Sequence, residues 1–122
     1  MKSVILVGIG GALGSILRYL LGTTINKIYH GPFPIGTFVV NLIGCVLIGI
    51  ITALIIKQNI INNDLKMLLI VGFCGGFTTF SSFSQENIQL INSGNFSILT
   101  FNIIASVCLG IIGVWAGLNI IK

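Results

Sequence analysis

The stretch of sequence that decides the fold is residues 72–84, GFCGGFTTFSSFS. It lies inside a long apolar run, yet it holds a Gly-Gly pair followed by five hydroxyl side chains within seven residues. Glycine loosens a helix, and Ser and Thr side chains can satisfy the backbone groups that a break exposes. Non-helical backbone in a bilayer is tolerated only where it faces protein or a water-filled path. We therefore predict a membrane span that is broken mid-membrane and faces an interior.

The composition of the whole chain agrees with a membrane location. Of 122 residues, 55% are apolar and only 7% are charged, whereas a soluble domain carries roughly 25% charged residues. Six scattered Lys and Arg residues form no basic patch, so nucleic acid is excluded as a partner. The cysteines Cys45, Cys74 and Cys108 are odd in number and lie in apolar runs, which predicts free buried thiols.

The length of the chain accommodates four membrane spans, because each needs about 20 apolar residues. The apolar runs predict an all-α membrane protein with one transmembrane domain over residues 1–122 and spans at about 4–25, 35–56, 65–91 and 98–121. Four spans place both termini on the same side of the membrane. Asp64 is expected to cap the third span.

Several glycines are spaced by four residues, which clears one helix face for close backbone approach. The pairs are Gly10/Gly14, Gly72/Gly76 and Gly113/Gly117. For the first and last pairs this spacing favours simple packing of a helical bundle.

Polar side chains recur at helical spacing near the predicted break. Phe80 and Phe83 share one helical face, and Thr79, Ser82 and Glu86 share a neighbouring one. The third span therefore carries an aromatic strip beside a hydroxyl strip.

The other spans add isolated polar residues. Asn41 lies mid-span and is either a pore-lining group or a hydrogen-bonding contact between helices. Arg18 is expected in the last turns of the first span, either as a functional charge or as a side chain that snorkels to the interface. Asn102 and Ser106 lie one turn apart in the fourth span. Because these groups are nearly all hydrogen-bond donors or neutral, the set suits an anion better than a cation.

Three motifs together resemble the CrcB/Fluc fluoride ion channel family. They are Gly10-Gly11-x-x-Gly14-x-x-x-Arg18-Tyr19, Gly36-Thr37-x-x-Val40-Asn41-x-x-Gly44 and the stretch 72–84. The match runs through three of the four spans in the family's order. This resemblance implies an antiparallel, dual-topology dimer with two pores that lets fluoride leave the cell passively.

The resemblance also implies which residues serve the ion. The fluoride path would be lined by Arg18, Asn41, Thr79, Phe80, Ser81, Ser82, Phe83, Glu86, Asn102 and Ser106. Asn102 occupies a position where other members often have Tyr. The backbone carbonyls of Gly75 and Thr78 would hold one structural Na⁺ on the dimer axis, since an uncharged carbonyl cage suits Na⁺ better than a divalent ion.

The orientation of the chain in the cell membrane can be argued from charge. The side of both termini carries Lys2, Lys57, Lys66 and Lys122, whereas the opposite side carries Lys27, with Arg18 near it. This bias predicts cytoplasmic termini if the orientation is fixed. A dual-topology chain should be closer to balance, so the partner is either a second copy, which we favour, or an oppositely oriented paralogue.

Other function classes fit less well. A four-span multidrug exporter needs a membrane-buried carboxylate in its first span, and this first span has no acidic residue. A non-transporting assembly subunit would explain the glycines but not the hydroxyl-aromatic string. An enzyme is not expected, because Ser81 and Ser82 have no nearby His and His30 lies in a connection.

Overall fold

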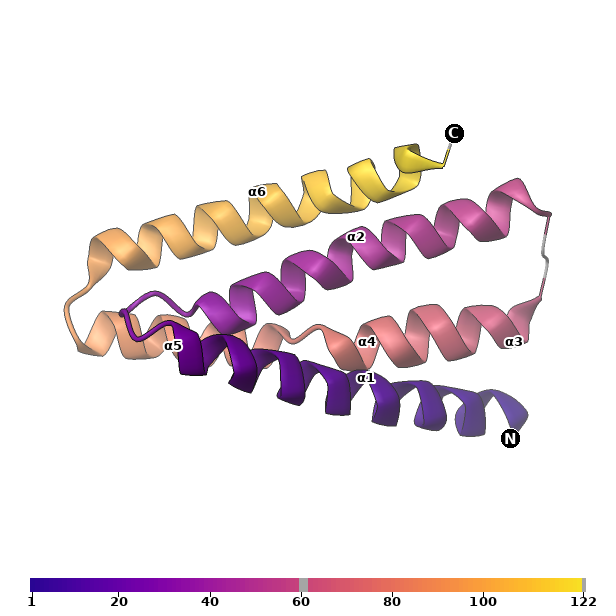
Figure 1. Ribbon diagram of the computed structural model, residues 1–122, viewed down its shortest axis with the longest axis horizontal. Coiled ribbons are helices and arrows are strands. Elements are labelled where there is room, and N and C mark those ends of the chain that lie inside the picture. Colours follow the sequence, from indigo (N-terminus) through magenta and orange to yellow (C-terminus); the bar gives the residue numbers. More distant parts are fainter. Residues whose placement is uncertain (60–61, 122) are drawn as a thin grey trace.

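A computed structural model describes residues 1–59 and 62–121, and it is all-helical over that part of the chain (Figure 1). Its elements are α1 (Lys2–Ile28), α2 (Ile35–Lys57), α3 (Asn63–Leu65), the π-helix η1 (Lys66–Cys74), α4 (Gly75–Phe77), α5 (Phe80–Asn92) and α6 (Phe96–Ile120). The segment from α3 to α5 forms one long unit, which gives four helical segments long and apolar enough to cross a membrane. The prediction of an all-α, four-span chain is confirmed.

Both chain ends lie at the same end of the bundle, as four spans require (Figure 1). Exposed Lys2 and Asp64 form an ion pair of 2.8 Å that joins the start of α1 to α3 at this end. Lys122, which contributes to the predicted charge bias, lies outside the described residues.

Two helix ends differ from the sequence-based expectation. α1 continues to Ile28, so Arg18 lies ten residues before its end rather than in its last turns. Just before this extension, Thr23 and Thr24 donate their hydroxyls back to preceding carbonyls. The cap of the third segment is Asn62, whose side chain accepts from the Asp64 N–H. The prediction that Asp64 is this cap was wrong.

Close glycine contacts join the helices in two pairs. α1 packs on η1 and α4, and a Cβ added to Gly14 would lie 2.2 Å from the Phe73 carbonyl oxygen. α2 packs on α6, and a Cβ on Gly117 would lie 2.3 Å from the Val46 carbonyl oxygen. Backbones therefore touch where the spaced glycines predicted close approach.

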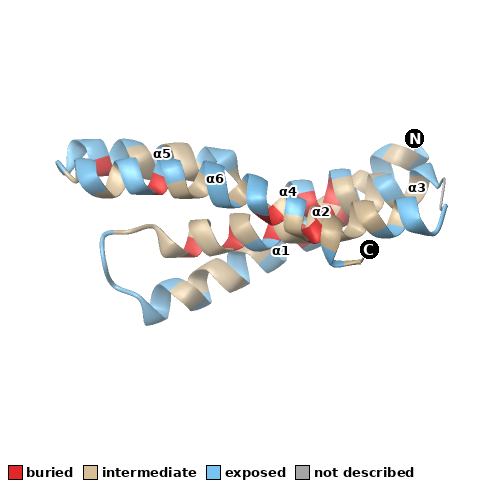
Figure 2. Ribbon diagram, turned by 90° about the horizontal axis from the view of Figure 1, so that it is seen from above, coloured by how far each residue is buried: buried red, intermediate tan, exposed pale blue. Residues whose placement is uncertain are grey.

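Fully buried side chains are few and lie mainly in the middle of the bundle, around α4 (Figure 2). The cysteines are free, as predicted, but only Cys74 is buried. Cys45 is half-buried and Cys108 is exposed on α6, so the expectation that all three are buried was wrong.

The third segment breaks at Thr78 and Thr79, which are both extended. The break thus lies within the stretch 72–84, and Gly75 and Gly76 before it remain helical. Before the break, η1 and α4 lie against α1, whereas α5 lies against α6 and α2 and makes no contact with α1. The break therefore transfers the chain from α1 to α6, as Figure 2 shows.

Candidate functional site

The backbone of the break is satisfied by its own hydroxyls. Thr78 donates both its N–H and its hydroxyl to the Cys74 carbonyl oxygen, each at 3.0 Å. Thr79 caps α5, because its hydroxyl oxygen accepts from the Ser82 N–H at 3.2 Å. The sequence pattern predicted this use of Ser and Thr side chains at a break.

Asn41 of α2 pairs with the backbone of Thr79 at both ends of its amide. Its Oδ1 accepts from the Thr79 N–H at 2.8 Å, and its Nδ2 donates to the Thr79 carbonyl oxygen at 3.1 Å. The amide thus replaces the helical partners that Thr79 lacks. Since Nδ2 carries two hydrogens, one donor remains for another acceptor.

Arg18 reaches the other side of the break. Its Nε donates to the Gly76 carbonyl oxygen at 3.0 Å, in the last helical turn before the break. This bond joins α1 to α4 in mid-span, so Arg18 does not snorkel to the interface. The remaining guanidinium donors border a small cavity of about 160 Å³, the arginine cavity, which Thr37, Thr79 and Ser82 also line.

A larger open groove lies on the opposite face of the break. This aromatic groove, of about 510 Å³, is lined by Asn41, Gly44, Cys45, Ile48, Ile70, Val71, Cys74, Gly75, Thr78, Thr79, Phe80, Phe83, Ser106, Val107 and Val114. The rings of Phe80 and Phe83 meet edge to face with centroids 5.8 Å apart. Phe80 is 81% exposed, so little of the described part of the chain covers its ring.

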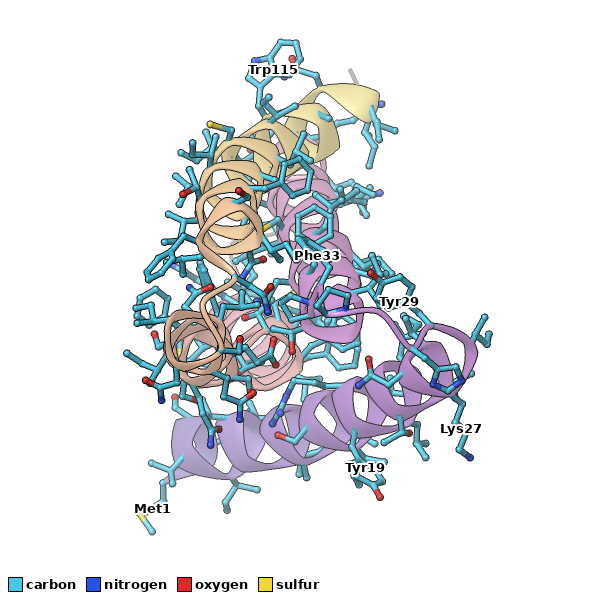
Figure 3. The ribbon with its side chains drawn as sticks, turned by 90° about the vertical axis from the view of Figure 1, so that its left-hand side faces the viewer. Met1, Tyr19, Lys27, Tyr29, Phe33 and Trp115 are labelled. Atoms are coloured by element: carbon cyan, nitrogen blue, oxygen red, sulfur yellow. The ribbon has the colours of Figure 1, made fainter. Side chains whose placement is uncertain are left out.

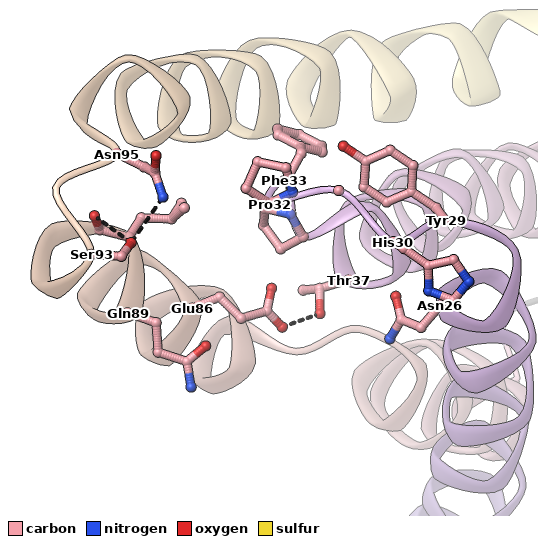
Figure 4. A pocket seen from close by; sticks show the side chains of 13 residues that line it. Asn26, Tyr29, His30, Pro32, Phe33, Thr37, Glu86, Gln89, Ser93 and Asn95 are labelled. Carbon is pink, nitrogen blue, oxygen red and sulfur yellow. Dashed lines mark hydrogen bonds between the residues drawn. The ribbon is translucent and has the colours of Figure 1, made fainter.

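A polar cavity of about 580 Å³ lies at the end of the bundle opposite the termini, and we call it the vestibule (Figure 4). The loop after α1 and the polar face of α5 form its walls, including Asn26, His30 and Gln89. In this cavity Thr37 donates its hydroxyl to Glu86 Oε1. Among the described residues, no partner reaches the buried Glu86 Oε2.

Figure 3 views the molecule from the vestibule end. Phe33 lies between the helices there, and its ring meets those of Phe38 and Phe101 at 5.4 and 5.6 Å. Lys27 and Tyr19 point away from the bundle. These ring contacts hold the loop after α1 against α2 and α6, and Phe33 also lines the polar cavity.

The three cavities adjoin one another through shared residues. Asn26 and Thr37 line both the vestibule and the arginine cavity, and Thr79 lines both the arginine cavity and the aromatic groove. A nearly continuous series of polar groups thus leads from the end of the bundle to the break.

The fourth helix contributes two of the predicted residues. Asn102 is 3% exposed and donates to Asn87 Oδ1 at 2.7 Å, while the Ser106 hydroxyl donates to Asn102 Oδ1 at 3.2 Å. Ser106 also lines the aromatic groove and a neighbouring enclosed cavity of about 20 Å³ beside Asn41. Such a volume is close to that of one water molecule. Asn102 lines neither space.

The predicted residues fall into two groups by location. Arg18, Asn41, Thr79, Phe80, Ser82, Phe83, Glu86 and Ser106 line the described cavities, whereas Ser81 and Asn102 do not. Ser81 is exposed and its Oγ lies 3.1 Å from Thr79 Oγ1. Sequence reasoning missed Asn87 and Asn26, and it did not foresee that Thr37 pairs with Glu86. The only sequence signal for Asn26, Thr37 and Asn87 is that they are polar and lie within a few residues of predicted ones or at the ends of apolar runs.

No group of three or more His, Cys, Asp or Glu that could hold a metal occurs among residues 1–59 and 62–121. The residues predicted to bind Na⁺ offer carbonyls instead. The last carbonyls of a helix lack intrahelical partners, and Gly75 and Thr78 fall in that part of the third segment. Both line the aromatic groove, so their chemistry fits a small hard cation.

Comparison with known proteins relates the chain to one family. Residues 5–118 match the family described as CrcB-like protein, Camphor Resistance (CrcB). The fluoride-specific ion channel FluC of Flavobacterium psychrophilum is 48% identical over 100% of this chain and 98% of its own length. FluC of Phocaeicola vulgatus is 49% identical over 97% of both chains. FluC of Geobacter sulfurreducens is 39% identical over 97% of this chain and 95% of its own.

Proposed function

Because this chain belongs to the CrcB-like family, we propose that it is a fluoride-selective channel through which fluoride leaves the cell passively. The relatives that it matches over their whole length are named fluoride-specific ion channels, so the protein is a membrane channel and not an enzyme. The observation that carries the proposal is a series of adjoining cavities that starts at the polar vestibule and ends in the aromatic groove at the broken third segment.

The chemistry of the cavities suits fluoride. This ion is small, accepts hydrogen bonds strongly and is costly to dehydrate, so a pore must replace its water with donors. Hydroxyls, the second Nδ2 hydrogen of Asn41 and the positive edges of the Phe80 and Phe83 rings supply such contacts. None of them is a fixed cation, which would hold the ion too tightly to release it.

The proposed path follows the order of the cavities. Fluoride enters through the vestibule near Thr37 and Glu86, passes Arg18 and Ser82, and crosses Thr79 into the aromatic groove. There it meets Phe80, Phe83, Asn41 and Ser106. Ser81 becomes part of this path when a second chain covers its exposed side. Asn102 does not line the path and acts through its hydrogen bonds to Asn87 and Ser106.

We propose that a second, antiparallel copy covers the aromatic groove and completes two pores. The groove is largely apolar and open, and Phe80 and Val107 are exposed within it. Two copies in opposite orientations would also bring two breaks together on one axis. A heterodimer with an oppositely oriented paralogue is the alternative.

A structural Na⁺ on that axis belongs to the same proposal. The carbonyls of Gly75 and Thr78 from both copies would hold it, and the ion would supply a fixed positive charge between the pores. We expect fluoride efflux or dimer stability to fall when Na⁺ is replaced on both sides by a large organic cation. If neither fluoride efflux nor dimer stability changes on this replacement, the structural Na⁺ is rejected but the proposed channel function stands.

The test of the proposed function is efflux from proteoliposomes followed with a fluoride electrode. We expect rapid fluoride release that excess chloride does not inhibit, and no chloride release under the same gradient. Empty liposomes and an Asn41→Asp variant are the controls. Absence of fluoride release from well-assembled protein would reject the proposal, and uptake of a cationic drug instead would favour the exporter class.

The orientation of the chain separates the two dimer models. In cells or vesicles, a protease-sensitive tag at the N-terminus should be cleaved in about half of the copies of a dual-topology homodimer. Cleavage of all or none would show a fixed orientation, for which the positions of Lys2, Lys57 and Lys66 predict cytoplasmic termini.

A further inference from the structure

A row of three hydrogen-bonded side chains connects α5 to the aromatic groove. The Ser106 hydroxyl donates to Asn102 Oδ1, and Asn102 Nδ2 donates to Asn87 Oδ1. Asn102 is the buried polar side chain at the centre, only 3% exposed, so water does not compete for its two ends. Ser106 is the member that lines the groove.

The direction of these bonds determines what Ser106 offers to the groove. A serine hydroxyl has one hydrogen and two lone pairs. While that hydrogen points to Asn102, Ser106 presents only lone pairs to the groove, and lone pairs repel an anion. The arrangement therefore conflicts with a direct role of Ser106 toward fluoride unless the row reverses.

The direction of the hydrogen bonds in this row can reverse without any movement of the helices. The two ends of an amide are nearly equal in size, so turning the amides of Asn87 and Asn102 exchanges donors for acceptors. Asn87 Nδ2 then donates to Asn102 Oδ1, and Asn102 Nδ2 donates to Ser106 Oγ. The present separations of 2.7 and 3.2 Å suit N–H···O bonds in that direction as well. The Ser106 hydrogen is then free to point into the groove.

We propose that Asn87 and Asn102 are positioning residues that turn Ser106 into a hydrogen-bond donor for the permeating anion. This inference rests on the proposed channel function. Because both residues carry amides rather than carboxylates, the row can take either direction, and an anion in the groove selects the one that aims the Ser106 hydrogen at it. Asn87 thereby affects conduction without touching the ion.

The test compares two substitutions at position 87 that differ in hydrogen bonding but little in size. Asn87→Asp can only accept, so it holds Asn102 Nδ2 toward itself and keeps the Ser106 hydrogen on Asn102. Asn87→Leu removes the bond and leaves Asn102 free to turn. We expect fluoride efflux of Asn87→Asp to be about fivefold lower than that of Asn87→Leu at neutral pH, the effect of one net hydrogen bond.

Ser106→Ala provides the matched background. The negative charge of Asn87→Asp acts in both backgrounds, but the hydrogen of Ser106 exists in only one. The ratio between the Asp and Leu variants should therefore shrink several-fold when Ser106 is replaced, as a double-mutant cycle measures for coupled residues. Asn102→Asp, which can only accept at both ends, should lose efflux in the same Ser106-dependent way and replaces Asn87→Asp if that variant does not assemble.

Two outcomes would overturn the inference. One is a ratio of fluoride efflux between Asn87→Asp and Asn87→Leu that is the same in the wild-type and Ser106→Ala backgrounds. That result would show that Asn87 is only a packing contact. The other is wild-type efflux from Ser106→Ala itself. Both leave the proposed channel function standing, whereas failure of that function would be seen as absent efflux from the unmodified protein.

Discussion

The two halves of the third segment differ in almost every respect. Residues 63–77 are mostly apolar, and their backbone packs directly on α1 at its glycines. The Leu68 carbonyl and the Phe73 amide face Gly10, and the Phe73 carbonyl faces Gly14. Residues 80–92 are rich in hydroxyls and amides, avoid α1 and border the polar cavities. The tight half, residues 63–77, positions the break, and the loose half, residues 80–92, borders open cavities.

Close backbone packing and access to the cavities therefore belong to different halves of the third segment. At Gly10 and Gly14 an added Cβ would lie 2.2 Å from a backbone oxygen, so only glycine permits this close packing of α1 on the segment before the break. Beyond the break, side-chain hydrogen bonds replace backbone contact.

The largest expected effect comes from breaking the tight half. Gly14→Val would place a branched side chain where even a Cβ lies 2.2 Å from the Phe73 carbonyl oxygen. Overpacking against side chains costs roughly 1–3 kcal/mol, and a backbone neighbour yields less. We expect no assembled protein by size-exclusion chromatography. Gly22→Ala, where nothing lies within 4 Å, is the control and should assemble normally.

A smaller effect is expected at the junction between the halves. Asn41→Asp keeps the acceptor for the Thr79 N–H but sets a carboxylate oxygen against the Thr79 carbonyl and repels fluoride. Fluoride efflux should fall at least about tenfold, with the protein still assembled. Asn92→Asp, at the exposed end of α5, adds the same charge at a residue that lines none of the described cavities and should conduct. Equal efflux of both variants would make Asn41 a simple contact between helices.

The aromatic strip tests whether the loose half contacts the ion. Phe80→Ile and Phe83→Ile keep apolar bulk but remove the ring edges, so each should lower efflux about fivefold to tenfold, the scale of one aromatic contact. Phe96→Ile, on the exposed start of α6, is the matched control. Normal efflux from both groove variants would place the pore elsewhere.

The smallest effect is expected at the single side-chain bond from α1 to the break. Arg18→Lys keeps the positive charge but loses the Nε bond to the Gly76 carbonyl oxygen. Loss of one such bond predicts a change in efflux of about twofold to fivefold. Arg18→Gln, which also loses the charge, should conduct less than Arg18→Lys. The reverse order would show that the charge of Arg18 plays no part in attracting the anion.

The four helices and the interrupted third span follow from composition and from local chemistry, since apolar length and hydroxyl clustering are properties of neighbouring residues. The position of the break does not. Gly75 and Gly76 are poor helix formers, yet both remain helical and the break falls at the hydroxyls instead. The small size of Gly76 lets α4 pack on Gly11 of α1. The π-helix η1 had no sequence signal.

The site was predictable as a set of residues but not as a set of bonds. Asn41 and Arg18 stand out as polar groups in apolar runs, whereas their partners, the backbone of Thr79 and of Gly76, have no side-chain signature. Asn87 and Asn102 are fifteen residues apart on different helices, so only the packing of α5 on α6 reveals that they pair. The roles of these residues toward fluoride stay predictions until efflux is measured.

The interruption at Thr78 and Thr79 also has an electrical consequence. The aligned peptide units of a helix create a macrodipole equal to roughly half a positive charge at its N-terminus and half a negative charge at its C-terminus. α4 ends at Phe77 and α5 begins at Phe80, so two opposite poles face each other across two residues in mid-membrane. The negative pole falls among the carbonyls of Gly75 and Thr78, and the positive pole falls at the start of α5 beside the aromatic groove. One interruption therefore places helix-dipole fields of opposite sign next to each other, and the dipoles themselves need no ionised side chain.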